Sequence, residues 1–460
     1  MITGVVQFFY PDIKKDEIKK YSLLAVAFLF TIGAYWLLRL LKDLVLYKLA
    51  FPVSLGYNSD EGRQWAPITK AISPFVVLGV VMIYTKLVDL FEKQKLFYII
   101  ASFYTICFAI IGTILYLQAT HGSEFVGATA LKYTGICNYL LTESLGSVLV
   151  ALFWSFTVSI STAEQAKRAF PFIVALGQIG SITGSSLMLI KTPPTWPLFV
   201  VAVGCLIGLM AAIRYLVATT PADQMRSDKE EKKSKPDMFG GIKLLFTQPY
   251  LLGVLVVSTF YEISGTIMDY QMKSQASILF DESTFKWFLG IFGVASNGLA
   301  FVLALLGTSA IIKRFGVRIC LQIYPVSCAI SIIALYTFYQ SGLSTAVTLF
   351  WATFGVMMIV KGVSYAVNNP VKEMMYIPTS KDAKFKAKGI IDMLGGRSAK
   401  ASGAQIGGFL NVKGNPLASI QNLMLYGSLI SLGIIGVWIL AAFYVGNKNQ
   451  KLVKSGEIIG

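Results

Sequence analysis

Long apolar runs alternate with short polar connections over almost the whole chain. A helix that crosses a bilayer needs about 20 mostly apolar residues, and the chain offers twelve runs of that kind. The predicted spans lie near residues 21–47, 67–84, 96–118, 134–160, 171–190, 196–218, 248–272, 286–311, 319–340, 343–369, 389–411 and 417–445. We therefore predict an all-α polytopic membrane protein.

A polar segment divides these spans into two sets of six. Residues 219–237 read TTPADQMRSDKEEKKSKPD. We predict an N-terminal six-helix half over 1–218, a charged cytoplasmic linker over 219–247 and a C-terminal six-helix half over 248–460. Short basic turns recur in corresponding places, YTKLVDLFEKQKLFYI after the second span and SAIIKRFGVRICL after the eighth. Two such halves around a charged loop are typical of the major facilitator architecture.

Composition and charge narrow the class of protein further. Charged residues make up only 14 % of the chain and apolar residues 55 %, whereas a soluble domain carries about 25 % charge. This excludes a soluble enzyme of this length. The net charge is +16, and Lys and Arg gather in alternate connections, which predicts that both termini are cytoplasmic. The positive charge therefore reflects topology, and we expect no nucleic-acid partner.

Several motifs of energy-coupled and catalytic proteins are missing from the sequence. There is no GxxxxGK[ST], HExxH, CxxC or GxSxG, and the chain has a single histidine, His121. We therefore expect no ATP hydrolysis, no enzyme, no metal and no other cofactor. A gradient or an exchange must then drive transport.

Charged residues within the apolar runs are candidate functional residues. Each costs roughly 2.5–3.5 kcal/mol in a bilayer by insertion scales. Spans 1, 4, 7 and 10 are equivalent by repetition and line the central cavity of this architecture. They carry Lys42, Glu143, Glu262 and Lys372, so each half contributes one cation and one anion. This pattern suits a polar anion that the lysines grip, with carboxylates that pair the lysines in the empty state.

Some of these charges also have structural interpretations. Arg39 and Asp43 are spaced i,i+4 and can pair on one helix face. Lys42 can snorkel to an interface, and Glu143 can bond to local hydroxyls. Lys372 follows a proline that stops or kinks a helix, so it can be an ordinary loop charge.

The fifth and eleventh spans carry further features. Arg397 and Lys400 lie in the eleventh span, and they can either support substrate binding or hold helices together. Gly180 and Gly184 form a GxxxG in the fifth span, which predicts close helix packing. Three more carboxylates, Asp269, Glu373 and Asp392, lie in or beside spans.

The most distinctive segment is residues 365–404, YAVNNPVKEMMYIPTSKDAKFKAKGIIDMLGGRSAKASGA. It resembles the signature of the bacterial and plastid ATP/ADP translocase family. Three other segments agree: LLRLLKDLVLYKLA at 37–50, LTESLGSVLVALFWSF at 141–156 and FYEISGTIMDYQMKSQ at 260–275. The similarity runs along nearly the whole chain.

This resemblance implies a function and a set of site residues. In the family, the charges that match Lys42, Glu143, Glu262 and Lys372 bind and move the nucleotide. The implied activity is exchange of external ATP for internal ADP, in the cell membrane of a bacterium or in a plastid. The turn Asn-Asn-Pro and the segment FWSFTVSIST depart from the family pattern. Other nucleoside triphosphates or NAD, carried with protons or another cation, therefore remain an alternative.

A working mechanism follows from the charges. Lys42 and Lys372, supported by Arg39, Arg397 and Lys400, would clamp the phosphates, because Arg binds phosphate in a bidentate fashion and Lys acts as a point charge. Adenine would stack on an aromatic residue; the candidates are Tyr35, Trp36 and Tyr261. We expect a monomer in the bilayer. The competing classes are a proton-coupled facilitator for a sugar, drug or peptide, and a membrane-embedded enzyme or flippase.

Overall fold

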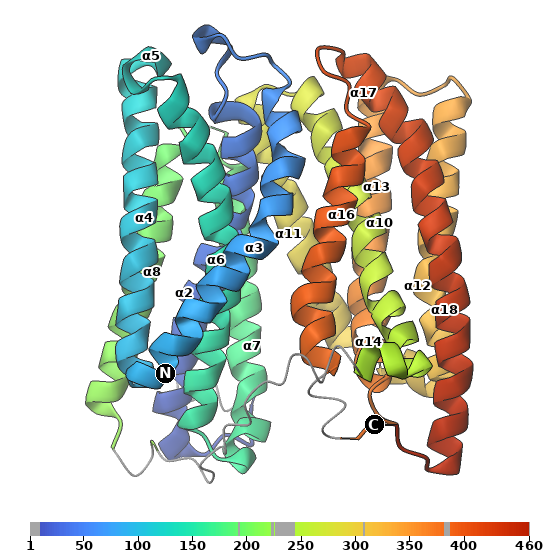
Figure 1. Cartoon of the computed structure of the whole chain (residues 1–460). Helices are drawn as coiled ribbons and strands as arrows, with labels where there is room; N and C mark the ends of the chain where they lie inside the picture. Colours follow the sequence, from blue (N-terminus) through green and yellow to red (C-terminus); the bar gives the residue numbers. More distant parts are fainter. Residues whose placement is uncertain are drawn as a thin grey trace. The chain divides into compact units, whose positions relative to one another are not determined.

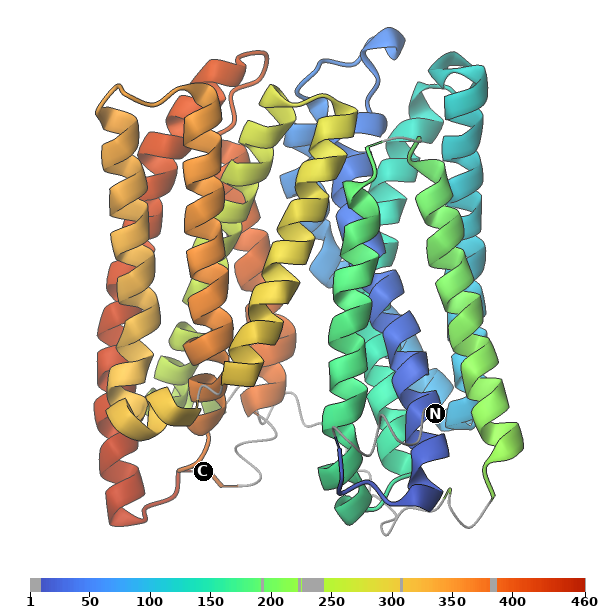
Figure 2. The same ribbon diagram turned by 180° about the vertical axis from the view of Figure 1, so that it is seen from behind.

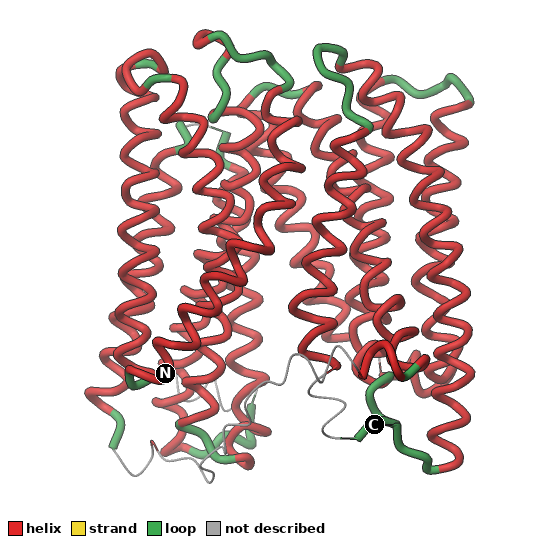
Figure 3. Tube along the Cα trace, viewed as in Figure 1, coloured by secondary structure: helices red, strands yellow, loops and turns green. Residues whose placement is uncertain are grey.

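The computed structural model describes residues 10–191, 194–221, 225, 244–306, 309–380 and 387–459. Within these ranges the chain is almost entirely helical, with a single β-bridge between Thr379 and Ile459 (Figure 3). Eleven of the described helices are long and apolar enough to cross a membrane. The prediction of an all-α polytopic membrane protein is confirmed.

The helices follow the predicted spans closely (Figure 1). The first part of the chain contains α2 (Lys15–Leu44), the π-helical turn η1 (Val45–Leu49), α3 (Glu61–Leu90), α4 (Lys93–His121), α5 (Ser123–Val126), α6 (Ala128–Ser159), α7 (Ala163–Ser186) and α8 (Trp196–Thr219). The second part contains α10 (Pro249–Leu279), α11 (Glu282–Leu306), α12 (Ser309–Gln340), α13 (Ala346–Val363), η5 (Ser364–Asn368), α14 (Asn369–Met374), η6 (Ile391–Gly395), α16 (Gly396–Phe409), α17 (Pro416–Asn422), η7 (Leu423–Gly427) and α18 (Ser428–Ser455).

Local sequence signals set several helix ends. Thr162 and Gln165 form a capping box that begins α7, because the side-chain oxygen of each residue accepts a hydrogen bond from the backbone N–H of the other. Pro249 occupies the first turn of α10, where a missing N–H costs nothing. Gly122 and Gly127 have φ angles of 88° and 85°, and they separate α4, α5 and α6 with turns that residues with a Cβ rarely adopt.

The chain divides into two compact units. Unit 1 comprises Met1–Ser59, Phe75–Lys233 and Glu282–Asn297, and unit 2 comprises Asp60–Pro74, Ser234–Asp281 and Gly298–Gly460. The first part of α3 thus belongs to unit 2, and the first part of α11 belongs to unit 1. Most of the segment predicted as the linker, residues 222–224 and 226–243, lies outside the described residues.

Unit 1 is built around α2, which packs most extensively on α7 and α8 (Figure 2). Glycines allow the close approach of α2 and α7. A Cβ at Gly180 would lie 2.5 Å from the carbonyl oxygen of Leu29, and one at Gly184 would collide with the backbone of Gly33. The close packing predicted from the GxxxG is therefore confirmed.

Unit 2 repeats this arrangement with α10 and α16. These two helices pack extensively, and a Cβ at Gly403 on α16 would lie 2.5 Å from the carbonyl oxygen of Ile263 on α10. Helices α2 and α7 are the first and fifth long helices, and α10 and α16 occupy the seventh and eleventh places. The recurrence of one glycine-mediated contact in both units supports a duplicated half.

Three of the four π-helical turns adjoin the charged residues of interest. Turn η1 follows Lys42, turn η5 precedes Lys372, and turn η6 contains Asp392. Pro370 lies in the first turn of α14, so the chain remains helical through the proline. Lys372 therefore belongs to a helix and is not a loop charge. Single π-helical turns are frequent at functional sites.

Candidate functional site

Lys42 is the buried centre of the charged cluster in unit 1. It lies near the end of α2 and is only 5 % exposed. Its ammonium nitrogen lies 3.2 Å from Oδ1 of Asp43 and 3.3 Å from Oε1 of Glu143 on α6. It also lies 3.6 Å from the ring centroid of Tyr139, one turn before Glu143. Two carboxylates and an aromatic face thus replace the water that burial removes.

Arg39 completes this cluster one turn earlier on α2. Its guanidinium carbon lies 4.6 Å from the ring centroid of Trp36, and it is close enough to act electrostatically on Lys42. The two cations and the carboxylates of Asp43 and Glu143 sum to zero charge. The cluster is therefore electrically balanced within itself.

Glu262 is the corresponding carboxylate of unit 2. It lies in the middle of α10, and its Oε1 is 3.2 Å from the ammonium of Lys400 on α16. The Tyr261 hydroxyl donates a 2.8 Å hydrogen bond to the same oxygen. Arg397 lies one turn before Lys400 and is partly buried. Sequence symmetry selected Glu262 and Lys372 in this half without assigning a pair, and in the structure Lys400 is the partner of Glu262.

Lys372 pairs with a different carboxylate. Its ammonium lies 3.0 Å from Oδ1 of Asp392 in turn η6, and its side chain is 17 % exposed. The same ammonium lies 5.8 Å from the ring centroid of Tyr261. Tyr261 therefore lies beside both charge pairs of unit 2. Glu373 instead pairs with Lys388 at 2.6 Å, on the more exposed side of α14.

A second carboxylate on α10 lies two turns beyond Glu262. Asp269 accepts a 2.7 Å hydrogen bond from Lys273, in an i,i+4 pair. Lys361 on α13 is near enough to act electrostatically on both Glu262 and Asp269, and Lys70 on α3 acts on Asp269. Lysines from three other helices thus face the two α10 carboxylates of unit 2.

Sequence reasoning missed several residues of these clusters, among them Lys70, Lys361 and Tyr139. Lys361 interrupts the apolar run FGVMMIVKGV, so its cost in a bilayer could have marked it as a candidate. Tyr139 gave no signal, because aromatic residues make up 13 % of the chain and its position over an ammonium depends on packing. Within the described residues no group of three or more His, Cys, Asp or Glu side chains is arranged to hold a metal ion.

Comparison with known proteins identifies the family. A sequence model described as TLC ATP/ADP transporter matches residues 2–449. The chain belongs to this family. It is therefore a multi-pass integral membrane transporter, as the helices indicated.

Named relatives of this TLC family protein come from plastids and from bacteria. ADP,ATP carrier protein 2, chloroplastic, of Arabidopsis thaliana is 26 % identical over 97 % of this chain and 77 % of its own length. ADP,ATP carrier protein 1 of Chlamydia muridarum is 27 % identical over 95 % of this chain and 90 % of its own.

Solved structures support the fold. The inward-facing crystal structure of a bacterial homologue of the iron transporter ferroportin has a TM-score of 0.66. It is 12 % identical and covers 93 % of this chain and 99 % of its own. At this identity the likeness concerns the fold alone, which is of the major facilitator type.

Proposed function

We propose that this protein exchanges ATP for ADP across a membrane as a secondary transporter. The observation that carries the proposal is a set of ammonium–carboxylate pairs inside membrane-spanning helices of both units. The family membership and the names of the relatives support a nucleotide as the substrate.

In the proposed binding mode, a phosphate group of the nucleotide replaces a carboxylate as the partner of each lysine. In unit 1 a phosphate group would take the place of Glu143 beside Lys42 and draw on Arg39. In unit 2 phosphate groups would displace Asp392 from Lys372 and Glu262 from Lys400, with Arg397 in support. Each lysine keeps an anionic partner throughout, which matters most for Lys42, because an uncompensated buried charge carries a large penalty.

Exchange, in preference to net uptake, follows from the same pairs. Without a nucleotide, the carboxylates would hold the ammonium groups in place. A bound nucleotide would take the place of the carboxylates beside the ammonium groups. If only the nucleotide-bound form reorients quickly, inward movement of one nucleotide requires outward movement of another. Since ATP carries more negative charge than ADP, the membrane potential would bias exchange by about 2.3 kcal/mol per elementary charge and 100 mV.

The cellular setting forms part of the proposal. We place the protein in a bacterial inner membrane as a monomer, with both termini in the cytoplasm. The basic connections of the sequence support this orientation, and the Chlamydia relative supports a bacterial setting.

Uptake of α-labelled ATP by proteoliposomes tests the proposal. Vesicles are preloaded with ADP or left empty, and protein-free vesicles serve as the control. Uptake that requires internal ADP is the expected result. Equal uptake by empty vesicles would refute exchange and indicate net import with a coupling ion. Absence of ATP uptake in both would refute ATP as the substrate. Uptake of other labelled nucleotides would then show whether the protein carries any nucleotide.

A further inference from the structure

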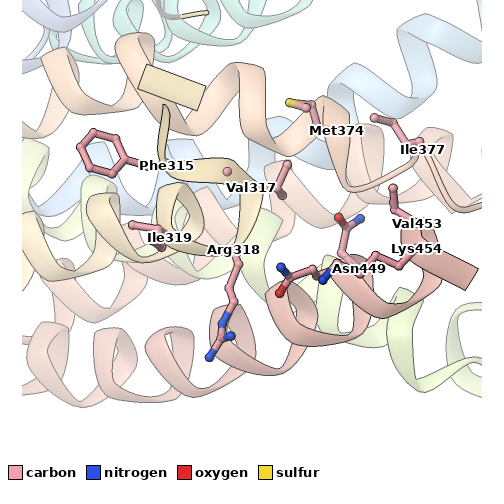
Figure 4. Close-up of a pocket in the computed structure, with 11 residues that line it drawn as sticks. Phe315, Val317, Arg318, Ile319, Met374, Ile377, Asn449, Val453 and Lys454 are labelled. Atoms are coloured by element: carbon pink, nitrogen blue, oxygen red, sulfur yellow. The ribbon is translucent and has the colours of Figure 1, made fainter. Parts of the chain in front are cut away.

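A pocket lies at the end of unit 2 that carries the last turns of α18 (Figure 4). It has a volume of about 610 Å³ and lies between the start of α12, the end of α14 and α18. Its walls are mainly apolar, with Phe315, Ile319, Met374, Ile377 and Val453 among the lining residues. None of the residues that form the ion pairs of α10, α14 and α16 lines it.

Two residues that line this pocket are cationic, Arg318 from α12 and Lys454 from α18. The Arg318 guanidinium carbon lies 5.5 Å from the ring centroid of Phe443 on α18, so its charge lies where the pocket meets the apolar side chains of that helix. The lining residues include no carboxylate. Arg314, Lys448 and Lys451 are exposed on the same two helices, so the surroundings of the pocket are strongly basic. This charge is complementary to an anion and is not neutralised by the lining residues.

The inner wall of the pocket is a built structure. Asn449 lines it and is only 3 % exposed. Its side-chain amide donates a 2.8 Å hydrogen bond to the Tyr250 hydroxyl, which itself donates a 2.6 Å bond to the carbonyl oxygen of Met375. These bonds join α18, α10 and the end of α14. The pocket therefore has a fixed polar wall beneath its basic rim.

Exposed apolar side chains continue away from the pocket along both helices. On α12 they are Ile319, Val326, Ile330 and Ile333, which recur at helical spacing on one face. On α18 they are Phe443, Leu440 and Val437. A basic, hydrogen-bonded end thus adjoins two apolar stripes, which matches the head group and the acyl chains of a phospholipid.

The length of the last helical span places the basic end at head-group depth. Pro416–Ser455 is a helical span of 40 residues. At a rise of 1.5 Å per residue it is about twice as long as the ~30 Å hydrocarbon core. The excess length, together with the three exposed lysines of its final turns, Lys448, Lys451 and Lys454, indicates that these turns reach beyond the hydrocarbon.

We propose that this pocket binds one anionic phospholipid, with its phosphodiester on Arg318 and Lys454 and its acyl chains along the exposed stripes of α12 and α18. Basic pockets between membrane helices on the cytoplasmic side recognise such head groups. The proposal stands independently of the transported substrate, because it uses none of the residues assigned to nucleotide binding.

Native mass spectrometry of the purified full chain tests this site. The protein is incubated with phosphatidylglycerol or phosphatidylcholine of identical acyl chains, and the bound fraction is measured against lipid concentration. We expect phosphatidylglycerol to bind preferentially. The double variant Arg318→Gln/Lys454→Gln should weaken its binding by about 30-fold, since each cation near an anionic lipid contributes roughly a factor of five.

Arg314→Gln/Lys451→Gln is the matched control. It removes the same charge from the same two helices, at exposed residues that do not line the pocket. It should retain most of the phosphatidylglycerol binding. An equal loss in the control would overturn the proposal in favour of a general surface attraction. Equal binding of the two lipids, or displacement of the lipid by soluble inorganic phosphate, would also overturn it.

Val453→Trp supplies a test that leaves all charges in place. Val453 lines the pocket and is 53 % exposed, so a larger side chain fills the cavity without disturbing a buried core. We expect binding of phosphatidylglycerol to fall while the melting temperature in detergent stays unchanged. Unchanged lipid binding in this variant would contradict the assignment of the lipid to the pocket.

Discussion

Replacing Lys42 by glutamine separates a structural role of its side chain from a role in substrate binding. The ammonium lies between Asp43 and Glu143, at 3.2 Å and 3.3 Å. The cluster with Arg39 is neutral overall. Lys42→Gln leaves it with one net negative charge at a buried position.

The expected loss of stability follows from that charge. Removing one partner of a buried pair costs about 3–5 kcal/mol, because the other charge is left uncompensated. The Glu143 side chain is 30 % exposed, so water offsets part of the cost and we expect the lower end of this range. The double variant Lys42→Gln/Glu143→Gln restores neutrality, with Arg39 left opposite Asp43. It should recover most of the stability that the single variant loses.

Transport should behave differently from stability. A hydrogen bond to a charged group contributes about 1.5–3 kcal/mol, which corresponds to roughly a ten- to 150-fold change in affinity. If Lys42 contacts a phosphate, both the single and the double variant lose this contact. Exchange of ATP for ADP should therefore fall at least about tenfold in each variant, whatever their stability.

Two measurements on the same preparations check this reasoning. One is the melting temperature in detergent, and the other is ADP-dependent ATP uptake by proteoliposomes. Lys95→Gln is the control, because Lys95 is an exposed lysine that pairs with the similarly exposed Glu92 at 3.6 Å. Recovery of exchange in the double variant would refute a substrate role for Lys42. A single variant of unchanged stability would refute the electrostatic account of the cluster.

Three further predictions concern other parts of the molecule. Lys372→Gln should lower exchange at least about tenfold. Lys388→Gln, which removes the partner of the exposed Glu373, should leave exchange intact. Equal uptake by both variants would count against Lys372 as a phosphate ligand. Glu262→Gln should lower both the KM and the turnover of exchange, because Lys400 loses its competing carboxylate; a raised KM would contradict this. Gly180→Val should destabilise the protein by about 1–3 kcal/mol in thermal unfolding, whereas Gly204→Val, which has open space at its Cβ, should not.

Much of the fold could be predicted because a bilayer leaves few choices. Every spanning segment must satisfy its own backbone, so apolar length alone located the helices. The eleventh predicted span, 389–411, is the informative exception. It forms a helix interrupted by η6 and carries Asp392, Arg397 and Lys400, so it does not pass as a span by length and composition. Its charged residues lower its hydropathy, and two of them form ion pairs: Asp392 with Lys372 on α14, and Lys400 with Glu262 on α10.

The partners of the charged residues could not be predicted from the sequence. Repeat symmetry selected Lys42, Glu143, Glu262 and Lys372 one residue at a time and assigned no pairs. In the structure Lys42 pairs with Glu143, whereas Glu262 pairs with Lys400 and Lys372 pairs with Asp392. The π-helical turns η5 and η6 explain part of this difference, because each inserts a residue and turns the following side chains to another face.

The carboxylates that pair with Lys372 and Lys400 would affect the release of the nucleotide as well as its binding. A transporter must let go of its substrate, and a lysine that held a phosphate without competition would release it slowly. Asp392 and Glu262 lie 3.0 Å and 3.2 Å from their lysines, so they compete with phosphate for the same ammonium groups. Re-forming a pair compensates the charge at the moment the nucleotide leaves. On this argument a fixed carboxylate beside each lysine lowers affinity and raises turnover, which is why Glu262→Gln should tighten apparent binding while slowing exchange.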